Sequence, residues 1–379
     1  MPSFRVLVAG AGIGGLALAN GLRKAGIAVE VFEREPSVFA RGPGYRINMR
    51  PEGGQALLDC LPPNLGRLYL ATSNRHSLPR IAGYDAALRE LFRTDLPDPS
   101  HAHTSVDRLL LRQILLADLT DVVHFGKQVL GASQDAHGVA LRFADGRTAT
   151  GDVLVAADGT HSALRHQLLP DAEVADLSLG CVWGKTPVPD GVPDWVPDAV
   201  RNRYSGVFGP GGDQLMIGLF QPRQRVADAV AEFAPNARIR SVEDYLIWVY
   251  LGGGTLPGAV ADWHPSLRRL VETADPRSVV PVGIRVAAPV PAWPPSRITF
   301  LGDAIHTMSP AGGTGANTAL RDAADLAATL ASATDPRTAI AEYEPRLRER
   351  GEAAITQSLV YGEQFVATLA ASGKDSSDA

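Results

Sequence analysis

A glycine-rich turn next to the first predicted strand constrains the fold of this chain more than any other feature. Residues 5–9, RVLVA, form a short apolar run, and residues 10–15, GAGIGG, follow it at once and match the pattern G-x-G-x-x-G. Apolar residues at helical spacing continue to Gly26, and the run IAVEVFER then predicts a second strand. The segment therefore predicts a β-α-β unit that binds a dinucleotide.

The glycines of this turn have separate physical roles in such a unit. Gly10 makes a tight turn, Gly12 lets the backbone approach a pyrophosphate, and Gly15 lets the helix pack against the strand. Gly14 belongs to the first helical turn, whose free N–H groups and positive dipole end favour an anion. Glu33, at the end of the second strand, is placed to accept hydrogen bonds from an adenosine ribose. The pattern does not choose between FAD and NAD(P), because both contain the same ADP half.

A second candidate site is the stretch LGDAIHTMSPAGGTGANTALRDAADLA, residues 301–327. Asp303 follows a predicted buried strand, and a carboxylate at the carboxyl end of a parallel strand lies where such sheets bind ligands. Four of the six residues from Pro310 to Gly315 are glycine or proline, which leaves little side-chain bulk. Residues 315–317 then open an alanine-rich helix whose dipole would stabilise negative charge on a flat ring. A turn-forming role for Asp303 and simple helix packing at the glycines are the alternative interpretations.

Composition excludes several classes of partner. The formal net charge is −5 and 20% of the residues are charged, so the chain offers no excess of cations for nucleic acid or anionic lipid. No run reaches the roughly 18 apolar residues that span a bilayer, and the glycines of residues 10–15 argue against a signal peptide. Cys60 and Cys181 lie far apart without a C-x-x-C pattern. We therefore expect free buried thiols, no metal site, no membrane span and a cytoplasmic protein.

Three motifs in order resemble those of the class A flavin-dependent aromatic monooxygenases, whose relatives include para-hydroxybenzoate hydroxylase and the tetracycline-degrading monooxygenases. The first is the glycine turn with EVFER, in which Glu33 and Arg34 match cofactor-side positions. The second is VLVAADGTHSALR, which is similar to the family's Asp-Gly motif and contains Asp158. The third is residues 301–327, which is similar to its Gly-Asp motif. The resemblance covers most of the chain and is weakest over about residues 177–258.

This resemblance implies non-covalent FAD as the cofactor and NADPH or NADH as a transient reductant. No second G-x-G-x-x-G stands between a predicted strand and helix, which agrees with a nicotinamide that binds only briefly. The resemblance also implies that Asp303 contacts the ribityl chain and that Pro310 and Gly313 lie near the flavin ring. The expected cofactor-binding residues are Gly10, Gly12, Gly14, Gly15, Glu33, Arg34, Arg41, Arg108, Arg112, Asp158, Asp303, Pro310, Gly313, Gly315, Ala316 and Asn317.

The expected fold class is α/β, a Rossmann-like FAD-binding domain with an inserted antiparallel sheet and a long C-terminal helix. Alternating runs such as DQLMIGLF, together with Pro, Trp and Gly, mark the inserted sheet. The expected division is a discontinuous FAD-binding domain (1–75, 98–176 and 281–335), a substrate-binding sheet domain (76–97 and 177–280), a C-terminal helix (336–370) and a disordered tail (371–379).

The expected substrate residues come from two segments. Asn48 follows the second strand at the distance where relatives place substrate-side groups, although an ordinary turn residue is the alternative there. In DQLMIGLF, period two separates two faces, and the sequence does not decide which one faces the cofactor. One face would present Leu215, Ile217 and Leu219, and the other Met216, Gly218 and Phe220.

The implied activity is monooxygenation. NAD(P)H reduces FAD, O2 adds to form a flavin C4a-hydroperoxide, and one oxygen atom enters an aromatic or polyketide-like molecule. His306, His161 and His264 are the histidines nearest the motifs, and histidine titrates near neutrality. The resemblance implies structural roles for His306 and His264, and no catalytic residue is assigned. The expected partners are an aromatic substrate and O2, and the expected assembly is a monomer or homodimer in secondary metabolism or aromatic degradation. The alternatives are an FAD-dependent reductase or dehydrogenase and a flavoprotein that binds a reactive biosynthetic intermediate without oxygenating it.

Overall fold

The structure is a computed structural model that describes residues 4–40, 42, 44–75, 80–95, 104–189, 191–201 and 204–372. Arg41 lies outside the described residues. The expected tail, residues 371–379, also lies outside them apart from its first two residues, which belong to the last helix. Side chains are described as far as residue 362 in that helix.

The glycine turn follows the central strand of a parallel sheet, at the side formed by the carboxyl ends of the strands. Among the described residues this sheet has five strands in the order β17-β11-β1-β2-β7, and all four strand pairs are parallel. The central strand β1 carries VLVA with no exposed side-chain surface, as expected of a strand covered on both faces. The strand bounds are β1 Arg5–Ala9, β2 Ala28–Glu33, β7 Val123–Phe125, β11 Val153–Ala156 and β17 Ile298–Phe300.

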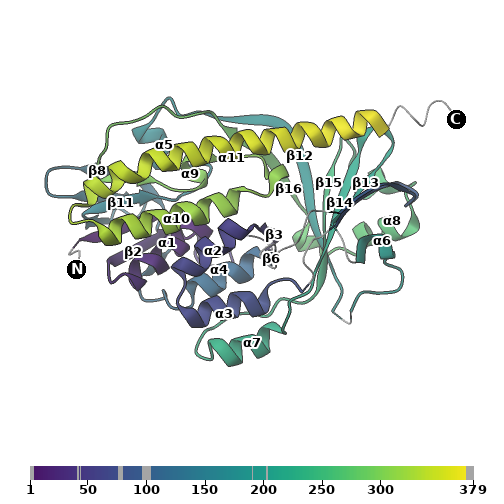
Figure 1. Cartoon of the computed structure of the whole chain (residues 1–379), viewed down its shortest axis with the longest axis horizontal. Coiled ribbons are helices and arrows are strands. Elements are labelled where there is room, and N and C mark those ends of the chain that lie inside the picture. The colour runs from purple at the N-terminus through teal and green to yellow at the C-terminus, as the bar shows by residue number, and fades with distance from the viewer. Residues whose placement is uncertain are drawn as a thin grey trace.

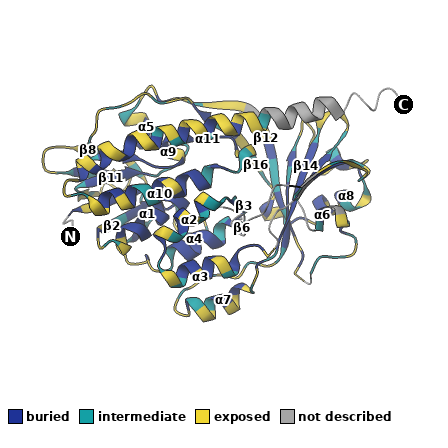
Figure 2. Ribbon diagram, in the orientation of Figure 1, coloured by how far each residue is buried: buried dark blue, intermediate teal, exposed yellow. Residues whose placement is uncertain are grey.

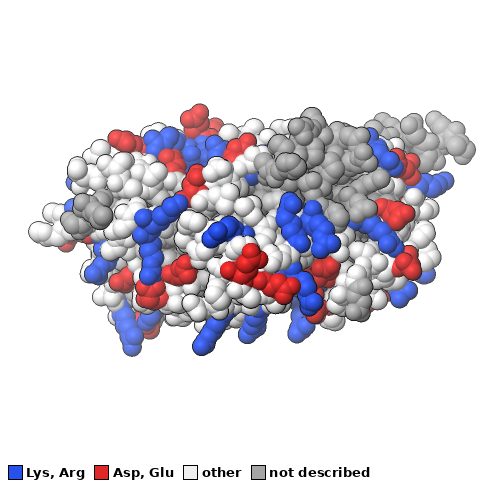
Figure 3. All heavy atoms as spheres, turned by 60° about the horizontal axis from the view of Figure 1, so that its bottom comes forward, with Lys and Arg blue, Asp and Glu red and all other residues white. Residues whose placement is uncertain are grey.

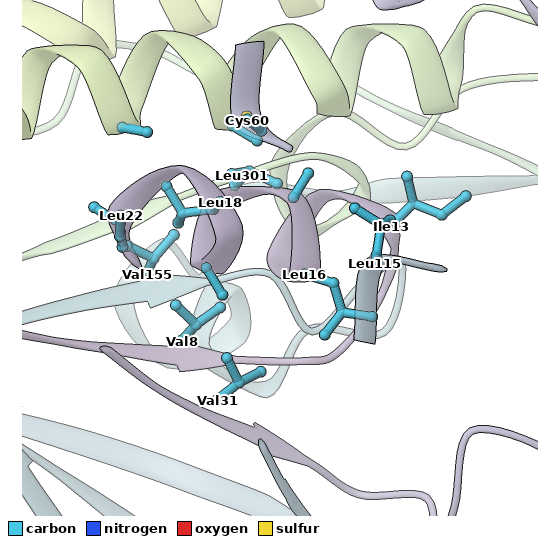
Figure 4. Packing of buried hydrophobic residues seen from close by; sticks show 14 of the residues in the cluster. Val8, Ile13, Leu16, Leu18, Leu22, Val31, Cys60, Leu115, Val155 and Leu301 are labelled. Atoms are coloured by element: carbon cyan, nitrogen blue, oxygen red, sulfur yellow. The ribbon is translucent and has the colours of Figure 1, made fainter. Parts of the chain in front are cut away.

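Helix α1, Ile13–Lys24, connects β1 to β2 and completes the predicted β-α-β unit. Its inner face is apolar, and Figure 4 shows Leu16, Leu18 and Leu22 beside strand residues of the same core. Its other face carries small residues: a Cβ on Gly14 would lie 3.3 Å from Ala319 Cβ, and one on Gly21 would lie 2.8 Å from Ala327 Cβ. This lack of side chains lets helix α10, Gly315–Ser332, pack closely on α1.

Further helices surround the parallel sheet, and the longest reaches the second domain. In Figure 1, α11 extends along one side of the molecule from the parallel sheet towards the second sheet. Buried and exposed residues alternate along its described part (Figure 2), as expected of an amphipathic helix laid on a core. The bounds are α2 Pro51–Cys60, α3 Pro63–Thr72, α4 Arg108–Leu116, α5 Ala163–Leu168, α7 Val226–Phe233, α9 Asp303–His306 and α11 Pro336–Ser372. A small antiparallel sheet contains β8 Val129–Gln134, β9 Val139–Phe143 and β10 Thr148–Gly151.

The second sheet forms the other half of the molecule (Figure 1). Within the described ranges it has seven strands in the order β16-β12-β15-β14-β13-β4-β5. All its pairs are antiparallel except β13 with β4, which is parallel. The bounds are β4 Arg80–Asp85, β5 Glu90–Asp95, β12 Val174–Pro187, β13 Tyr204–Phe208, β14 Gln214–Phe220, β15 Tyr245–Leu251 and β16 Val280–Ala287. The sheet thus also takes in residues 174–176 and 281–287, which the sequence assigned to the FAD-binding domain.

The predicted fold class is confirmed: a Rossmann-like domain carries an inserted, mainly antiparallel sheet and a long C-terminal helix. The outer face of the second sheet packs on α6, Asp198–Arg201, and α8, Pro265–Glu272, through a separate apolar core. Between the two sheets lies a two-stranded ribbon of β3, Arg46–Met49, and β6, Thr104–Asp107 (Figure 1). On the face shown in Figure 3, Lys and Arg side chains are interspersed with Asp and Glu.

Candidate functional site

The four glycines of the first turn differ in what surrounds them. Gly10 has a φ of +109°, and a Cβ there would lie 2.3 Å from Ala157 O. A Cβ on Gly15 would lie 2.1 Å from Gly10 O, and one on Gly14 would meet Leu301. Gly12 has an ordinary φ of −72°, and among the described residues no atom beyond its two chain neighbours lies within 4 Å of its Cβ position. The fold thus needs glycine at residues 10, 14 and 15, whereas residue 12 borders open space.

Gly12 is also the N-cap of α1, and as a glycine it offers no side chain to cap the helix. The first N–H groups of a helix have no partner within the helix and carry partial positive charge. The absence of a capping side chain leaves these donors available at the point where Gly12 is open. Open space beside uncapped donors fits the pyrophosphate of a dinucleotide.

Glu33 and Arg112 both hold the backbone of the glycine turn. The Glu33 carboxylate accepts hydrogen bonds from Ala11 N at 2.9 Å and Glu35 N at 3.0 Å. The buried Arg112 side chain donates to Ala11 O from Nη2 at 2.9 Å and from Nε at 3.2 Å. Its Nη2 also lies 3.8 Å from Glu33 Oε2. A carboxylate offers about four acceptor positions, so Glu33 keeps capacity for a ribose hydroxyl. Arg112 acts on the turn through its contacts with the backbone.

The other two arginines assigned to the cofactor side and still described lie in different settings. Arg34 is exposed, and its Nε lies 3.7 Å from Glu35. Arg108 begins α4 and is half-buried, with its backbone N–H donating to Tyr45 O at 2.8 Å.

The Asp-Gly segment follows β11 and connects to the Gly-Asp segment. Asp158 Oδ2 accepts a hydrogen bond from Ala163 N at 3.0 Å, and burial raises the pKa of this carboxyl. Ser162 caps α5 by accepting from Arg165 N. The Arg165 guanidinium then donates to Ala304 O at 2.9 Å, next to Asp303. The two motifs are therefore held together by a side chain, although they are far apart in the sequence.

Asp303 begins α9 with an exposed side chain, at the carboxyl end of the edge strand β17. Its Oδ1 lies 3.8 Å from the position of a Cβ on Gly315, so the carboxylate borders the start of α10. Thr314 is the N-cap of α10, and its side chain makes no capping hydrogen bond, because its hydroxyl donates to Met308 Sδ instead. The exposed carboxylate can accept hydrogen bonds from the hydroxyl groups of a polyol. The helix start beside it carries partial positive charge and can face an electron-rich ring edge.

The loop before α10 is held by Asn317. Its Oδ1 accepts from Arg50 N at 2.8 Å, and its Nδ2 donates to Asn48 O and Gly313 O, both at 2.9 Å. The amide is thereby used for protein contacts, so this residue shapes the loop with its side chain. Half-buried Ala316 adds no bulk beside it, and Pro310 is exposed at the start of the short 3-10 helix η4, Pro310–Gly312.

Gly313 has a φ of +59°, a left-handed conformation that favours glycine. A Cβ at this position would lie 3.7 Å from Asn48 Nδ2. The structure therefore brings the expected substrate residue Asn48 next to the expected flavin loop.

Strand β14 presents its two sets of side chains to opposite sides. Leu215, Ile217 and Leu219 belong to the apolar core shared with α8. On the other face, a Cβ on Gly218 would meet Arg46 of β3, and Phe220 stacks on Tyr245 with ring centroids 5.1 Å apart. The face of Met216, Gly218 and Phe220 is thus the one directed at the β3/β6 ribbon, and that it also faces the cofactor stays a prediction.

Sequence reasoning missed a buried charged group behind the Gly-Asp turn. Asp322 of α10 contacts His306 Nε2 at 2.5 Å and Arg350 Nε at 2.8 Å, and it accepts from Gly302 N at 3.2 Å. Burial alone would lower the pKa of His306, but the Asp322 carboxylate outweighs burial and raises it. Asp322 thus ties α9, α10 and α11 together and positions the turn that carries Asp303. No local signal in the sequence joins residue 322 to residues 306 and 350.

This pair predicts a pH-dependent stability. A raised pKa in the folded state means that the stabilisation by His306 is complete below its unfolded pKa of about 6.5 and is lost as the pH rises through the folded value. His306→Gln is therefore expected to lower Tm more at about pH 6 than at about pH 9. His137→Gln, at an exposed position, serves as the control, and its difference in Tm from the wild type should be the same at both pH values. An equal or larger loss for His306→Gln at alkaline pH would contradict this role.

A second missed group lies between the ribbon and the second sheet. Asp107 caps α4 by accepting from Leu109 N and Leu110 N, and its Oδ2 accepts from Lys185 Nζ at 2.7 Å and Tyr245 OH at 3.0 Å. Lys185 Nζ also lies 3.9 Å from the centroid of the Tyr245 ring. This buried pair joins β6 to β12 and β15 and so fixes the sheet against the ribbon.

The described side chains contain no group of three or more His, Cys, Asp or Glu residues that could hold a metal ion. Among the helices of the described ranges, none combines the length and the apolar character needed to cross a membrane. Cys60 and Cys181 are both buried and form no disulfide.

Comparison with known families agrees with this geometry. Residues 8–66, which contain the glycine turn and Glu33, match the family model described as an NAD(P)-binding Rossmann-like domain. Residues 269–358, which contain the Gly-Asp segment, match the model described as an FAD binding domain. Within these segments, the glycine turn follows β1 and the Gly-Asp turn follows β17, so both turns lie at the carboxyl edge of the parallel sheet.

Individual proteins resemble the chain over nearly its whole length. A dual O-methyltransferase/FAD-dependent monooxygenase of Cercospora beticola is 31% identical over 408 residues, which cover 94% of this chain and 45% of that protein. An FAD-dependent urate hydroxylase of Klebsiella pneumoniae is 28% identical and covers 91% of this chain and 86% of that protein. The solved structure of a proposed FAD containing monooxygenase from Photorhabdus luminescens has a TM-score of 0.80 and 30% identity, and covers 97% of this chain and 99% of that one. The chain spans about half the length of the first relative.

Proposed function

The chain belongs to the class A FAD-dependent monooxygenases, and we propose that it uses FAD, NAD(P)H and O2 to insert one oxygen atom into an aromatic or polyketide-like small molecule. The observation that carries this proposal is the meeting of two uncapped helix starts at one sheet edge. One is the start of α1 beside the open position at Gly12, and the other is the start of α10 beside Asp303.

The residues at this edge fit FAD. The first N–H groups of α1 would bind the pyrophosphate, Glu33 the adenosine ribose, and the Asp303 carboxylate the ribityl hydroxyls. The start of α10 would face the electron-rich edge of the ring, where its partial positive charge favours the reduced, anionic cofactor. When bound, FAD would accept a hydride from NAD(P)H and activate O2.

The chain's own task in this reaction is to position the substrate and exclude water. The ribbon residue Asn48, the loop at Gly313 and the inner face of β14 would enclose the substrate next to the ring. Buried side chains on that face, such as Met216 and Phe220, would keep water from the reacting atoms. The low bulk of residues 310–315 would leave room for O2 and the substrate.

Two of the histidines near the motifs have structural partners, which favours a mechanism without a histidine base. His306 is bound to Asp322, and His264 caps α8 by accepting from Ser266 N through Nδ1 at 3.2 Å. We propose that ionisation of the substrate itself supplies the electron density that oxygen transfer requires.

The proposal is tested on the purified, flavin-containing protein. NADH or NADPH oxidation and peroxide release are measured with and without phenols, indoles and polyketides. We expect at least one compound to accelerate NAD(P)H oxidation while lowering the peroxide released per NAD(P)H. Flavin reduction without any such coupling would favour a reductase, and no NAD(P)H-dependent reduction across the set would favour a non-oxygenating flavoprotein.

A further inference from the structure

Arg46 is a buried arginine on the ribbon between the two sheets. It begins β3, directly opposite Asp107 of β6, and only 6% of it is exposed. Residues 46 and 48 share one face of the strand, because successive side chains alternate. Asn48 on that face lies beside Gly313 of the flavin loop. Arg46 is therefore about 7 Å further along the same face, towards β14.

The guanidinium is enclosed by the second sheet on one side and by the ribbon on the other. Its Nε donates to Ser105 Oγ at 2.8 Å. Its Nη1 lies 2.3 Å from the position of a Cβ on Gly218, so the glycine makes room for it. Its Cζ lies 5.8 Å from the centroid of the Tyr204 ring. The glycine expected to contact the substrate thus accommodates an arginine instead.

The remaining nitrogen, Nη2, is buried and has no hydrogen-bond partner among the described residues. The nearest carboxylate along the ribbon, Asp107, uses both oxygens for the α4 start, Lys185 and Tyr245. Burial lowers the pKa of Arg46, but a guanidinium remains charged at neutral pH. A buried cation with an unpaired donor is unfavourable unless an anion completes it.

We propose that Arg46 binds an anionic oxygen of the substrate, so that the preferred substrates carry a carboxylate or an ionised phenol or enol on the ring system. This assignment rests on the proposed function and narrows its substrate class. The planar guanidinium matches a two-oxygen or delocalised oxyanion, and its Nη2 supplies the free donor. Met216, on the same face as Gly218, has the flexible side chain that can move to admit the ligand.

The proposal is tested by calorimetric binding to the FAD-containing protein without NAD(P)H. The probes are benzoate, naphthoate and hydroxynaphthoate, each compared with its neutral amide. We expect at least one anion to bind about tenfold or more tightly than its amide, a difference of about 1.4 kcal/mol. Arg46→Met and Arg46→Gln should abolish this preference, and Arg46→Lys should keep part of it. Arg142→Met, which removes an exposed arginine from β9, should leave it unchanged.

A second measurement separates a binding role from a structural one. Because Arg46 has no carboxylate partner among the described residues, Arg46→Met is expected to retain the flavin and to have a ligand-free Tm at or above that of the wild type. A large loss of Tm would instead indicate a structural arginine and overturn the proposal. The same holds if no anion binds better than its amide, or if the preference persists in Arg46→Met. These measurements need no turnover. An Arg46-dependent preference for anions without NAD(P)H oxidation would therefore contradict the proposed function but still support anion binding by Arg46.

Discussion

Gly12→Glu is expected to lose FAD while keeping the fold. The new carboxylate would enter the space where the pyrophosphate is proposed to bind. Two like charges about 4 Å apart repel by about 4 kcal/mol at an effective dielectric constant of about 20, which corresponds to roughly a thousandfold loss of affinity. The fold is not disturbed, because in the described part of the chain only the two neighbouring residues lie within 4 Å of this Cβ position, and the backbone φ of −72° suits any residue. A glutamate at a helix start is even favourable to the helix.

The measurement is the flavin content of the purified variant, followed by FAD titration of the apoprotein and its Tm. Gly14→Ala is the matched contrast, because its Cβ would lie 2.4 Å from Leu301 Cδ2 and 3.3 Å from Ala319 Cβ. That variant should lower Tm, whereas Gly12→Glu should lower only the affinity for FAD. Wild-type FAD affinity in Gly12→Glu would show that the dinucleotide does not bind at this turn.

Asp303→Ala is expected to have the second largest effect, a loss of FAD affinity of about 10- to 100-fold. Hydrogen bonds to a charged group contribute about 1.5–3 kcal/mol, and this exposed carboxylate is proposed to accept them from the ribityl chain. Its backbone oxygen, which accepts from Thr307 Oγ1 at 2.7 Å, is retained in the variant, so α9 should persist.

Two further variants separate the causes of such a loss. Asp303→Asn keeps one acceptor oxygen and should lie between alanine and the wild type. Asp335→Ala removes another exposed aspartate at a helix start, far from the flavin loop in sequence, and should keep full FAD affinity. If Asp303→Ala binds FAD as tightly as Asp335→Ala does, the ribityl assignment is wrong.

The parts of the site that were predictable from sequence are those fixed by local backbone geometry. The turn at residues 10–15 needs glycine because Gly10 has a positive φ and residues 14 and 15 touch other backbone or side-chain atoms. Such demands leave a short pattern in the sequence, and the strand before it and the helix after it follow from hydrophobic periodicity. The Gly-Asp loop is similar, with positive φ at Gly302 and Gly313.

The parts that were missed depend on contacts between distant segments. Arg46 faces β14 only because the ribbon lies against the second sheet, and Lys185 reaches Asp107 across 78 positions of sequence. Asp322 is one polar residue of an amphipathic helix until α9 and α11 bring His306 and Arg350 to it. Both faces of β14 are apolar in the sequence, so the alternation of side chains alone does not tell them apart. The packing of Leu215, Ile217 and Leu219 on α8 leaves the other face directed at the ribbon.

The central claim, that this chain is a monooxygenase, is tested most directly with isotopically labelled O2. The compound that best accelerates NAD(P)H oxidation is turned over by the FAD-containing protein under labelled O2 in ordinary water, and the product is analysed by mass spectrometry. We expect one labelled oxygen atom in each product molecule, with the other recovered in water. A product formed with NAD(P)H oxidation but without label from O2 would contradict it.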